Sequence, residues 1–91
     1  MLGVINDRYY DREINIIGHT DSDPIKKSKW KDNWQLSSER ALSVLRYLEK
    51  KGVTEKRLMG SAAGASRPVG PNTTTSGKAR NRRVEIVVNM R

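Results

Sequence analysis

One amphipathic segment in the middle of the chain constrains the fold more than any other feature. Between residues 36 and 52, apolar side chains recur at the i, i+3, i+4 and i+7 positions, which form one stripe of an α-helix. A helix with a single apolar stripe is stable only when that stripe is covered, so a second layer is required. The stripe consists of Ala41, Val44, Leu45 and Leu48.

The ends of this helix are marked by residues that favour helix termini. Ser37 is the expected N-cap, with Asn33 as the alternative one turn earlier, and Glu39 then suits the positive end of the helix. Gly52 fits the position just after the last turn. The sequence therefore predicts a helix that starts near residue 33 or 37 and ends before Gly52.

Segments of β-strand character stand on both sides of the helix. Residues 13–20 (EINIIGHT) and 83–89 (RVEIVVN) are rich in β-branched side chains and alternate between two faces. In the second segment we expect Val84, Ile86 and Val88 to form the buried face. Further expected elements are a strand over residues 58–62 and short helical turns over residues 53–57 and 76–81.

The order strand, helix, strand, turn, strand predicts an α+β fold in which a helix packs on a sheet as a two-layer sandwich. With 91 residues, the chain is expected to form a single domain over residues 1–91, with its motifs in residues 13–89. It has no cysteine, which excludes disulfides and thiolate metal sites. It also has no apolar run long enough to span a bilayer.

The charge balance favours anionic partners. Eighteen Lys and Arg against ten Asp and Glu give a net charge of +8. A basic run over residues 26–31 (KKSKWK) leaves a nucleic-acid-binding domain as the alternative function. No nucleic-acid fold motif accompanies that run, so a solvated loop is favoured and no nucleic-acid partner is expected.

Catalysis is not expected. His19 is the only histidine, and no second histidine or cysteine is present to share a metal with it. No nucleophile elbow of the G-x-S-x-G kind accompanies the hydroxyl residues, so a hydrolytic triad is not indicated. We expect His19 to fix a turn by hydrogen bonding, and we expect neither an enzyme nor a cofactor.

Three clusters occur in order along the chain. Gly18-His19-Thr20-Asp21 is followed by Asn33-x-x-Leu36-Ser37-x-x-Arg40-Ala41, and then by Asn72 and Gly77-x-x-x-Asn81-Arg82-Arg83-Val84-Glu85. Together they resemble the OmpA-like C-terminal domain, and within it the flagellar-stator (MotB-like) branch. The resemblance implies a β/α/β/α/β fold, of which the first strand and first helix are expected to be missing because residues 1–12 are too few for both.

The resemblance also implies a function. It implies non-catalytic binding of peptidoglycan through the diaminopimelate residue of its peptide stem, and a periplasmic domain that anchors an envelope or flagellar stator protein to the cell wall. A homodimer is possible, and membrane contact is expected only through segments outside this sequence. The site residues that it implies are Asp21 and Arg40 as main contacts, with Asn33, Arg82, Thr20 and Leu36 around them.

The chemistry of these residues suits such a ligand. Diaminopimelate carries an ammonium and a carboxylate on one carbon, so Asp21 can accept from the ammonium while Arg40 pairs with the carboxylate through its planar fork. We expect Arg40 in the first turn of the helix, where free backbone N–H groups add to the attraction. Arg82 and Arg83 flank a strand entry, so one is expected at the site and the other at solvent or a structural carboxylate.

Two further features of the sequence concern contacts with the ligand. Where the family usually has Gly-aromatic-Gly, this chain has Ala62-Ala63-Gly64, so one aromatic contact is lost. Trp30 and Trp34 have two open interpretations, because they could pack the long loop onto the domain or lie against sugar rings of the glycan.

Overall fold

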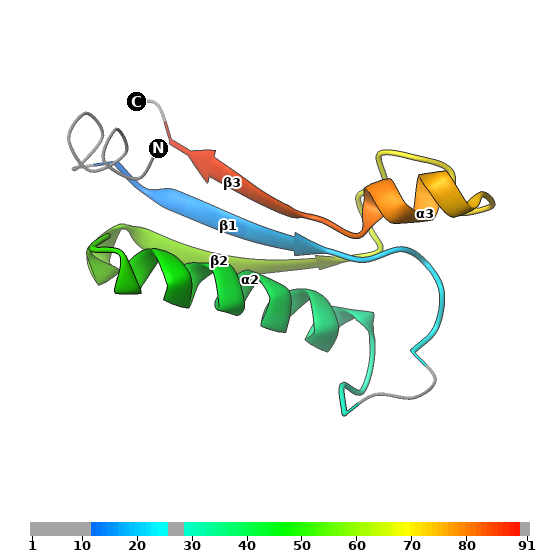
Figure 1. Cartoon of the computed structure of the whole chain (residues 1–91), viewed down its shortest axis with the longest axis horizontal. Coiled ribbons are helices and arrows are strands. Elements are labelled where there is room, and N and C mark those ends of the chain that lie inside the picture. Colours follow the sequence, from blue (N-terminus) through cyan, green and yellow to red (C-terminus); the bar gives the residue numbers. More distant parts are fainter. Residues whose placement is uncertain (1–11, 26–28, 90–91) are drawn as a thin grey trace.

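The computed structural model describes residues 12–25 and 29–89. Three strands and two α-helices alternate along this part of the chain (Figure 1). The elements are β1 (Ile14–His19), α2 (Asn33–Lys50), the 3-10 turn η1 (Glu55–Arg57), β2 (Leu58–Gly64), α3 (Thr75–Asn81) and β3 (Val84–Val88).

The three strands form one sheet in the order β2-β1-β3. β1 is parallel to β2 and antiparallel to β3, with Ile14 opposite Leu58 on one side and Val88 on the other. A parallel pair needs a long crossover, and α2 is the main element of that crossover. Figure 1 shows α2 lying along one face of the sheet, next to β1 and β2, with β3 farther away. The predicted α+β fold with a helix packed on a sheet is confirmed.

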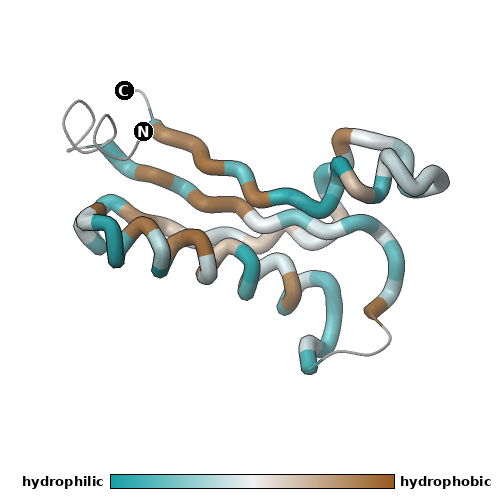
Figure 2. Tube along the Cα trace, in the orientation of Figure 1, coloured by the Kyte–Doolittle hydropathy of each residue, from teal (hydrophilic) through white to brown (hydrophobic). Residues whose placement is uncertain are grey.

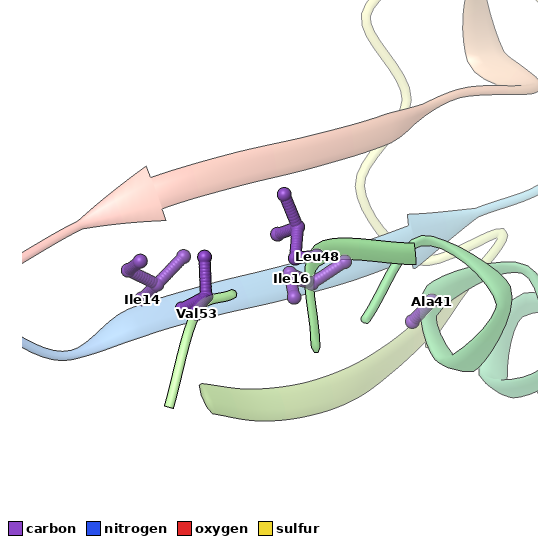
Figure 3. Packing of buried hydrophobic residues seen from close by; sticks show 5 residues of the cluster. All are labelled: Ile14, Ile16, Ala41, Leu48 and Val53. Carbon is purple, nitrogen blue, oxygen red and sulfur yellow. The ribbon is translucent and has the colours of Figure 1, made fainter. Parts of the chain in front are cut away.

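The apolar core lies between α2 and the central strand (Figure 3). Ile14 and Ile16 of β1 are completely buried against Ala41 and Leu48 of α2, and Val53 closes the core after the helix. Burial of each isoleucine contributes about 1.5–3 kcal/mol. Figure 2 shows hydrophobic residues at the beginning of β1 and more hydrophilic ones beyond its end, so the polar residues lie at the end of the sheet where β1 stops.

Gly18 allows α2 to approach β1 closely. A Cβ atom at Gly18 would lie 1.9 Å from the backbone oxygen of Ser37, a distance that no side chain can occupy. Ser37 is itself fully buried, and its Oγ accepts from the Gly64 N–H at 3.0 Å. The helix is thus fixed to the ends of both β1 and β2.

The start of α2 differs from the expectation. The helix begins at Asn33, and its N-cap is Asp32, whose side chain accepts from the Gln35 N–H. Ser37 is therefore not the N-cap, because its hydroxyl is used in the contact between α2 and β2. Glu39 consequently lies beyond the first turn, which contains no acidic residue.

The alternation predicted for β3 is only partly correct. Val84 and Val88 pack against the core, but Ile86 is 47% exposed. The reason is the position of α2, which lies over β1 and β2 and leaves much of β3 uncovered (Figure 1). Pairing of Ile86 with Ile16 in the ladder places both on the same sheet face, but α2 covers only Ile16 fully.

Two expectations concern parts of the chain outside this description. Residues 26–28 of the basic run lie outside the described residues. Residues 1–11 lie outside them too, so the expected lack of a first strand and first helix stays a prediction. Neither helix of the described part is long and apolar enough to cross a membrane.

Candidate ligand-binding site

Asp21 lies just beyond the end of β1 and is the centre of a polar network. The residue is only 8% exposed, and its Oδ2 accepts from Nη1 of Arg82 at 2.6 Å. Its Oδ1 accepts from the Asp23 N–H at 3.0 Å. An ionised carboxylate has about four acceptor positions, so these two bonds leave acceptor capacity for a ligand.

Thr20 and Asn33 hold the backbone around Asp21. Thr20 Oγ1 donates to the Asp21 carbonyl at 2.8 Å. Asn33 Nδ2 donates to the same carbonyl at 3.4 Å and to the Asp23 carbonyl at 3.0 Å. Their polar groups therefore shape the loop, which indicates a positioning role for both residues beside Asp21.

Arg40 lies close to this network but not where the sequence predicted. It is about two turns into α2 rather than in the first turn, because the helix already begins at Asn33. Arg40 therefore lies outside the turn that has free backbone N–H groups. Nη1 of Arg40 donates to the His19 carbonyl at 3.1 Å, which places the side chain beside the end of β1. A guanidinium group has five N–H donors, so the others stay available.

Arg40 and Leu36 line one wall of an open hollow of about 420 Å³. Trp30 and Lys29 lie on its loop side, and Nζ of Lys29 is 4.7 Å from the centre of the Trp30 ring. The role of Leu36 in ligand binding stays a prediction. Asp21 does not line this hollow.

The loop before α3 and the end of that helix bring Arg82 to Asp21. Asn81 is fully buried, and its Oδ1 accepts from the N–H groups of Val69 and Gly70 at 2.8 and 2.9 Å. Asn81 Nδ2 donates to Oδ1 of Asn72 at 2.8 Å, and that oxygen also accepts from the Ser22 N–H at 3.2 Å. This chain of bonds ties the α3 region to the loop that follows Asp21.

One ion pair of this region was not predicted from the sequence. Nζ of Lys78 lies 3.1 Å from Oδ2 of Asp23, so α3 holds the loop by a charge pair as well. Neither residue stood out in the sequence, because Lys and Asp are common in exposed loops and helices. Asn72 was noted as part of a motif, but its bridging role follows only from the folded geometry.

Arg82 and Arg83 pair with different carboxylates, Arg82 with Asp21 and Arg83 with Glu85. Arg83 Nε donates to Oε2 of Glu85 at 2.8 Å. This hydrogen bond lowers the pKa of the Glu85 carboxyl below its ordinary value of 4.5, and the charges of Arg83 and His19 add to the effect.

His19 does not fix a turn through its side chain, so that expectation is wrong. It is the last residue of β1 and is only 2% exposed, with its backbone N–H donating to the Arg83 carbonyl at 2.8 Å. Its Nε2 lies 3.2 Å from Oε1 of Glu85. Neither ring nitrogen has a hydrogen bond of acceptable geometry with the described residues.

The structure thus joins Asp21, Thr20, Asn33 and Arg82 in one network and places Arg40 and Leu36 on the adjacent hollow. A buried carboxylate and guanidinium groups near each other can bind a ligand that carries both an ammonium and a carboxylate. Within the described residues, no cluster of three or more His, Cys, Asp or Glu side chains could hold a metal ion.

A small two-layer α+β domain with a polar site at the end of its central strand is therefore defined. The chain belongs to the OmpA family, whose sequence model matches residues 3–82. It is similar to motility protein B of Bacillus subtilis, with 40% identity over 78 residues. The match covers 85% of this chain but only 30% of the length of that relative.

Solved structures agree with this assignment. The C-terminal domain of MotB from Helicobacter pylori superposes with a TM-score of 0.93 and 30% identity, covering 99% of this chain and 68% of that one. The cell wall anchor of the T6SS from Pseudomonas aeruginosa superposes with a TM-score of 0.81 and 35% identity, covering 96% and 62%. The predicted resemblance to the MotB-like branch is confirmed at the level of sequence and fold.

Proposed function

We propose that this domain binds peptidoglycan without cleaving it, through the diaminopimelate residue of the peptide stem. The observation that carries the proposal is the Asp21 carboxylate, which is largely buried and held by Arg82 at 2.6 Å. A buried carboxylate in a fixed orientation is a suitable acceptor for an ammonium group, because little reorganisation is needed on binding. The solved cell wall anchor among the similar structures supports the same class of function.

Arg40 is the partner for the ligand carboxylate. Its bond to the His19 carbonyl fixes the guanidinium group near the backbone that leads to Asp21, and its remaining donors can form the planar double contact that a carboxylate prefers. The ligand would thus be held at two charged ends, with the wall that contains Leu36 beside it. A site that offers one group of each charge selects for a zwitterion over a simple acid or amine.

The proposal includes the cellular setting. A domain that grips peptidoglycan in this way serves as the cell-wall anchor of a larger protein, in the periplasm, with that protein held in the inner or outer membrane and paired as a homodimer. The chain spans 30% of the length of its Bacillus relative, so the rest of such a protein would supply the membrane contact.

The test is co-sedimentation of the purified domain with isolated sacculi. Asp21→Asn and Arg40→Ala should each abolish sedimentation, while circular dichroism keeps the spectrum of the unchanged domain. Matched controls are Glu49→Gln and Arg80→Ala, which make the same charge changes at exposed positions on α2 and α3. The controls should sediment fully.

Ionic strength distinguishes specific binding from general attraction. The net charge of +8 favours loose association with any anionic polymer, and such association weakens steeply as salt is raised. Sedimentation should therefore be measured at raised salt. Full retention of either site variant under these conditions would contradict the proposed function.

A further inference from the structure

A second hollow, with a volume of about 550 Å³, lies on another part of the surface. It shares no lining residue with the hollow beside Arg40 and Leu36. Its walls come from Trp34 at the start of α2 and from Ser61 and Ala63 of β2. Arg83, just before β3, and Glu85 of β3 complete them. Its volume falls within the range of about 300–1,000 Å³ that is usual for small-molecule sites.

Trp34 offers this hollow a rigid aromatic surface. The indole packs on Gly64, because a Cβ atom at that glycine would lie 3.1–3.3 Å from Cε3, Cδ2 and Cζ3 of the ring. Gly64 also has a φ angle of +56°, so a larger residue would be strained there. The tryptophan is nevertheless 56% exposed. One side of an aromatic ring is thus fixed by the protein, and much of the residue is open to a ligand.

The polar groups around the ring are of mixed charge. Arg83 and Glu85 are paired at 2.8 Å, and the exposed Arg67 lies on the loop that borders the same hollow. The Glu85 side chain is still 41% exposed, so it can accept further hydrogen bonds. A strongly anionic ligand would meet the carboxylate and a cationic ligand would meet the arginines. A neutral ligand with several hydroxyl groups can use both donors and acceptors.

His19 gives a second, independent indication of a ligand. Its side chain is 3% exposed and lines the hollow; Nε2 lies 3.2 Å from Oε1 of Glu85, whereas Nδ1 has no partner among the described residues. A buried polar atom without a partner is rare in folded proteins and calls for a specific explanation. A ligand hydroxyl group can donate or accept, so it is a suitable partner for Nδ1 of His19.

We propose that this hollow is a carbohydrate subsite, in which a sugar ring packs on Trp34 and its hydroxyl groups bond with Glu85, Arg67 and His19. The inference rests on the proposed function, because it assigns the sugar to the glycan strand that carries the peptide stem. Binding of both parts of one polymer would raise the overall affinity above that of either contact alone.

Ala63 lines the hollow with a small side chain. It stands where the family usually has an aromatic residue, and both Ala62 and Ala63 line the hollow. Ala63→Phe should therefore fill the space without removing any polar group. This substitution tests the hollow itself, independently of the stacking residue.

Two soluble probes separate the subsite from the proposed stem-peptide site. The first is glycan strands from which an amidase has removed the stem peptides, and the second is the isolated stem peptide that contains diaminopimelate. Isothermal titration of the 91-residue chain with each probe gives the affinities. Trp34→Ala, Ala63→Phe and Arg67→Ala should each weaken glycan binding roughly fivefold or more, with stem-peptide affinity unchanged. Trp30→Ala, an aromatic control in the other hollow, should leave glycan binding intact.

The outcomes are distinguishable. The carbohydrate subsite is overturned if the unchanged chain does not bind the peptide-free glycan, or if Ala63→Phe and Arg67→Ala both bind it normally. Those two variants decide the matter even if Trp34→Ala fails to fold. Loss of the proposed function would instead appear as no binding of the stem peptide by the unchanged chain, whatever the glycan result.

Discussion

Arg82 and Asp21 are 61 positions apart in sequence, and their side chains meet at 2.6 Å at the end of β1. The Asp21 side chain is 11% exposed in this pair, while that of Arg82 is 43% exposed. Arg82 therefore acts as the partner that fixes the more buried carboxylate. It can still turn part of its guanidinium group toward solvent or a ligand.

Removal of Arg82 should reduce ligand affinity through its effect on Asp21. Arg82→Ala is expected to weaken binding of the diaminopimelate stem peptide at least about tenfold, since a charge-assisted hydrogen bond is worth roughly 1.5–3 kcal/mol. Arg83→Ala makes the same charge change one residue later and should leave this affinity close to that of the unchanged chain. Isothermal titration measures the affinity of both variants. Equal losses of affinity would show that the removed positive charge, and not the contact with Asp21, is responsible.

The close approach of α2 to β1 makes a sharp prediction for two glycines. Gly18→Ala should destabilise the fold by at least about 2 kcal/mol, because the new methyl group would overlap the Ser37 backbone oxygen. Gly60→Ala is the control, since its Cβ would lie 3.5 Å from Leu45 Cδ1, an ordinary contact. Urea denaturation compares the two free energies of unfolding, and similar values would refute the packing at Gly18.

The N-cap of α2 can be tested in the same way. Asp32→Ala should cost about 1 kcal/mol, because the Asp32 side chain accepts from the Gln35 N–H at 2.9 Å. Thr54→Ala serves as the comparison, since the side chain of Thr54 makes no capping bond to η1. Asp32→Ala should therefore lower the free energy of unfolding more than Thr54→Ala does. A larger loss at Thr54 than at Asp32 would be inconsistent with these helix starts.

Glu85 predicts a dependence of stability on pH. Its pKa is lowered in the folded state, mainly by the hydrogen bond from Arg83, so the folded state favours the ionised carboxylate. This contribution is present above the ordinary pKa of 4.5 and is lost as the pH falls through the lower folded-state pKa. Because the side chain is 41% exposed, Glu85→Gln should cost less than about 1 kcal/mol at neutral pH.

The measurement is thermal unfolding of the unchanged chain and Glu85→Gln at neutral and acidic pH. The difference in stability between them should shrink as the pH falls below 4.5, because the unchanged chain then loses its charge at this position. A difference that stays constant, or that grows in acid, would mean that Glu85 is not stabilised by Arg83.

Local sequence patterns predicted the elements better than their ends. The apolar stripe that includes Ala41 and Leu48 and the β-branched runs correctly indicated α2, β1 and β3. The N-cap residue of α2 was harder to predict, because Asp32, Asn33 and Ser37 are all good capping residues. In the folded chain Ser37 is buried and Asp32 is the cap. Exposure of Ile86 depends on where α2 lies across the sheet, which no local pattern specifies.

The candidate site was accessible from sequence only through the resemblance. Asp21 and Arg82 are ordinary charged residues in the sequence, and their contact depends on the loop and helix between β2 and β3. The hollow beside Trp34 was not predicted, although the small residues Ala62 and Ala63 were noted. Its shape depends on side chains from α2, β2 and β3 that meet only in the folded chain.

The positions of Arg82 and Arg83 constrain the length of the connection between α3 and β3. These neighbours have identical side chains, yet one pairs with Asp21 and the other with Glu85. Deletion or insertion of a single residue between Asn81 and Val84 would shift the strand register and present the wrong guanidinium group to each carboxylate. The connection between α3 and β3 is therefore expected to tolerate substitution at its exposed positions far better than any change in its length.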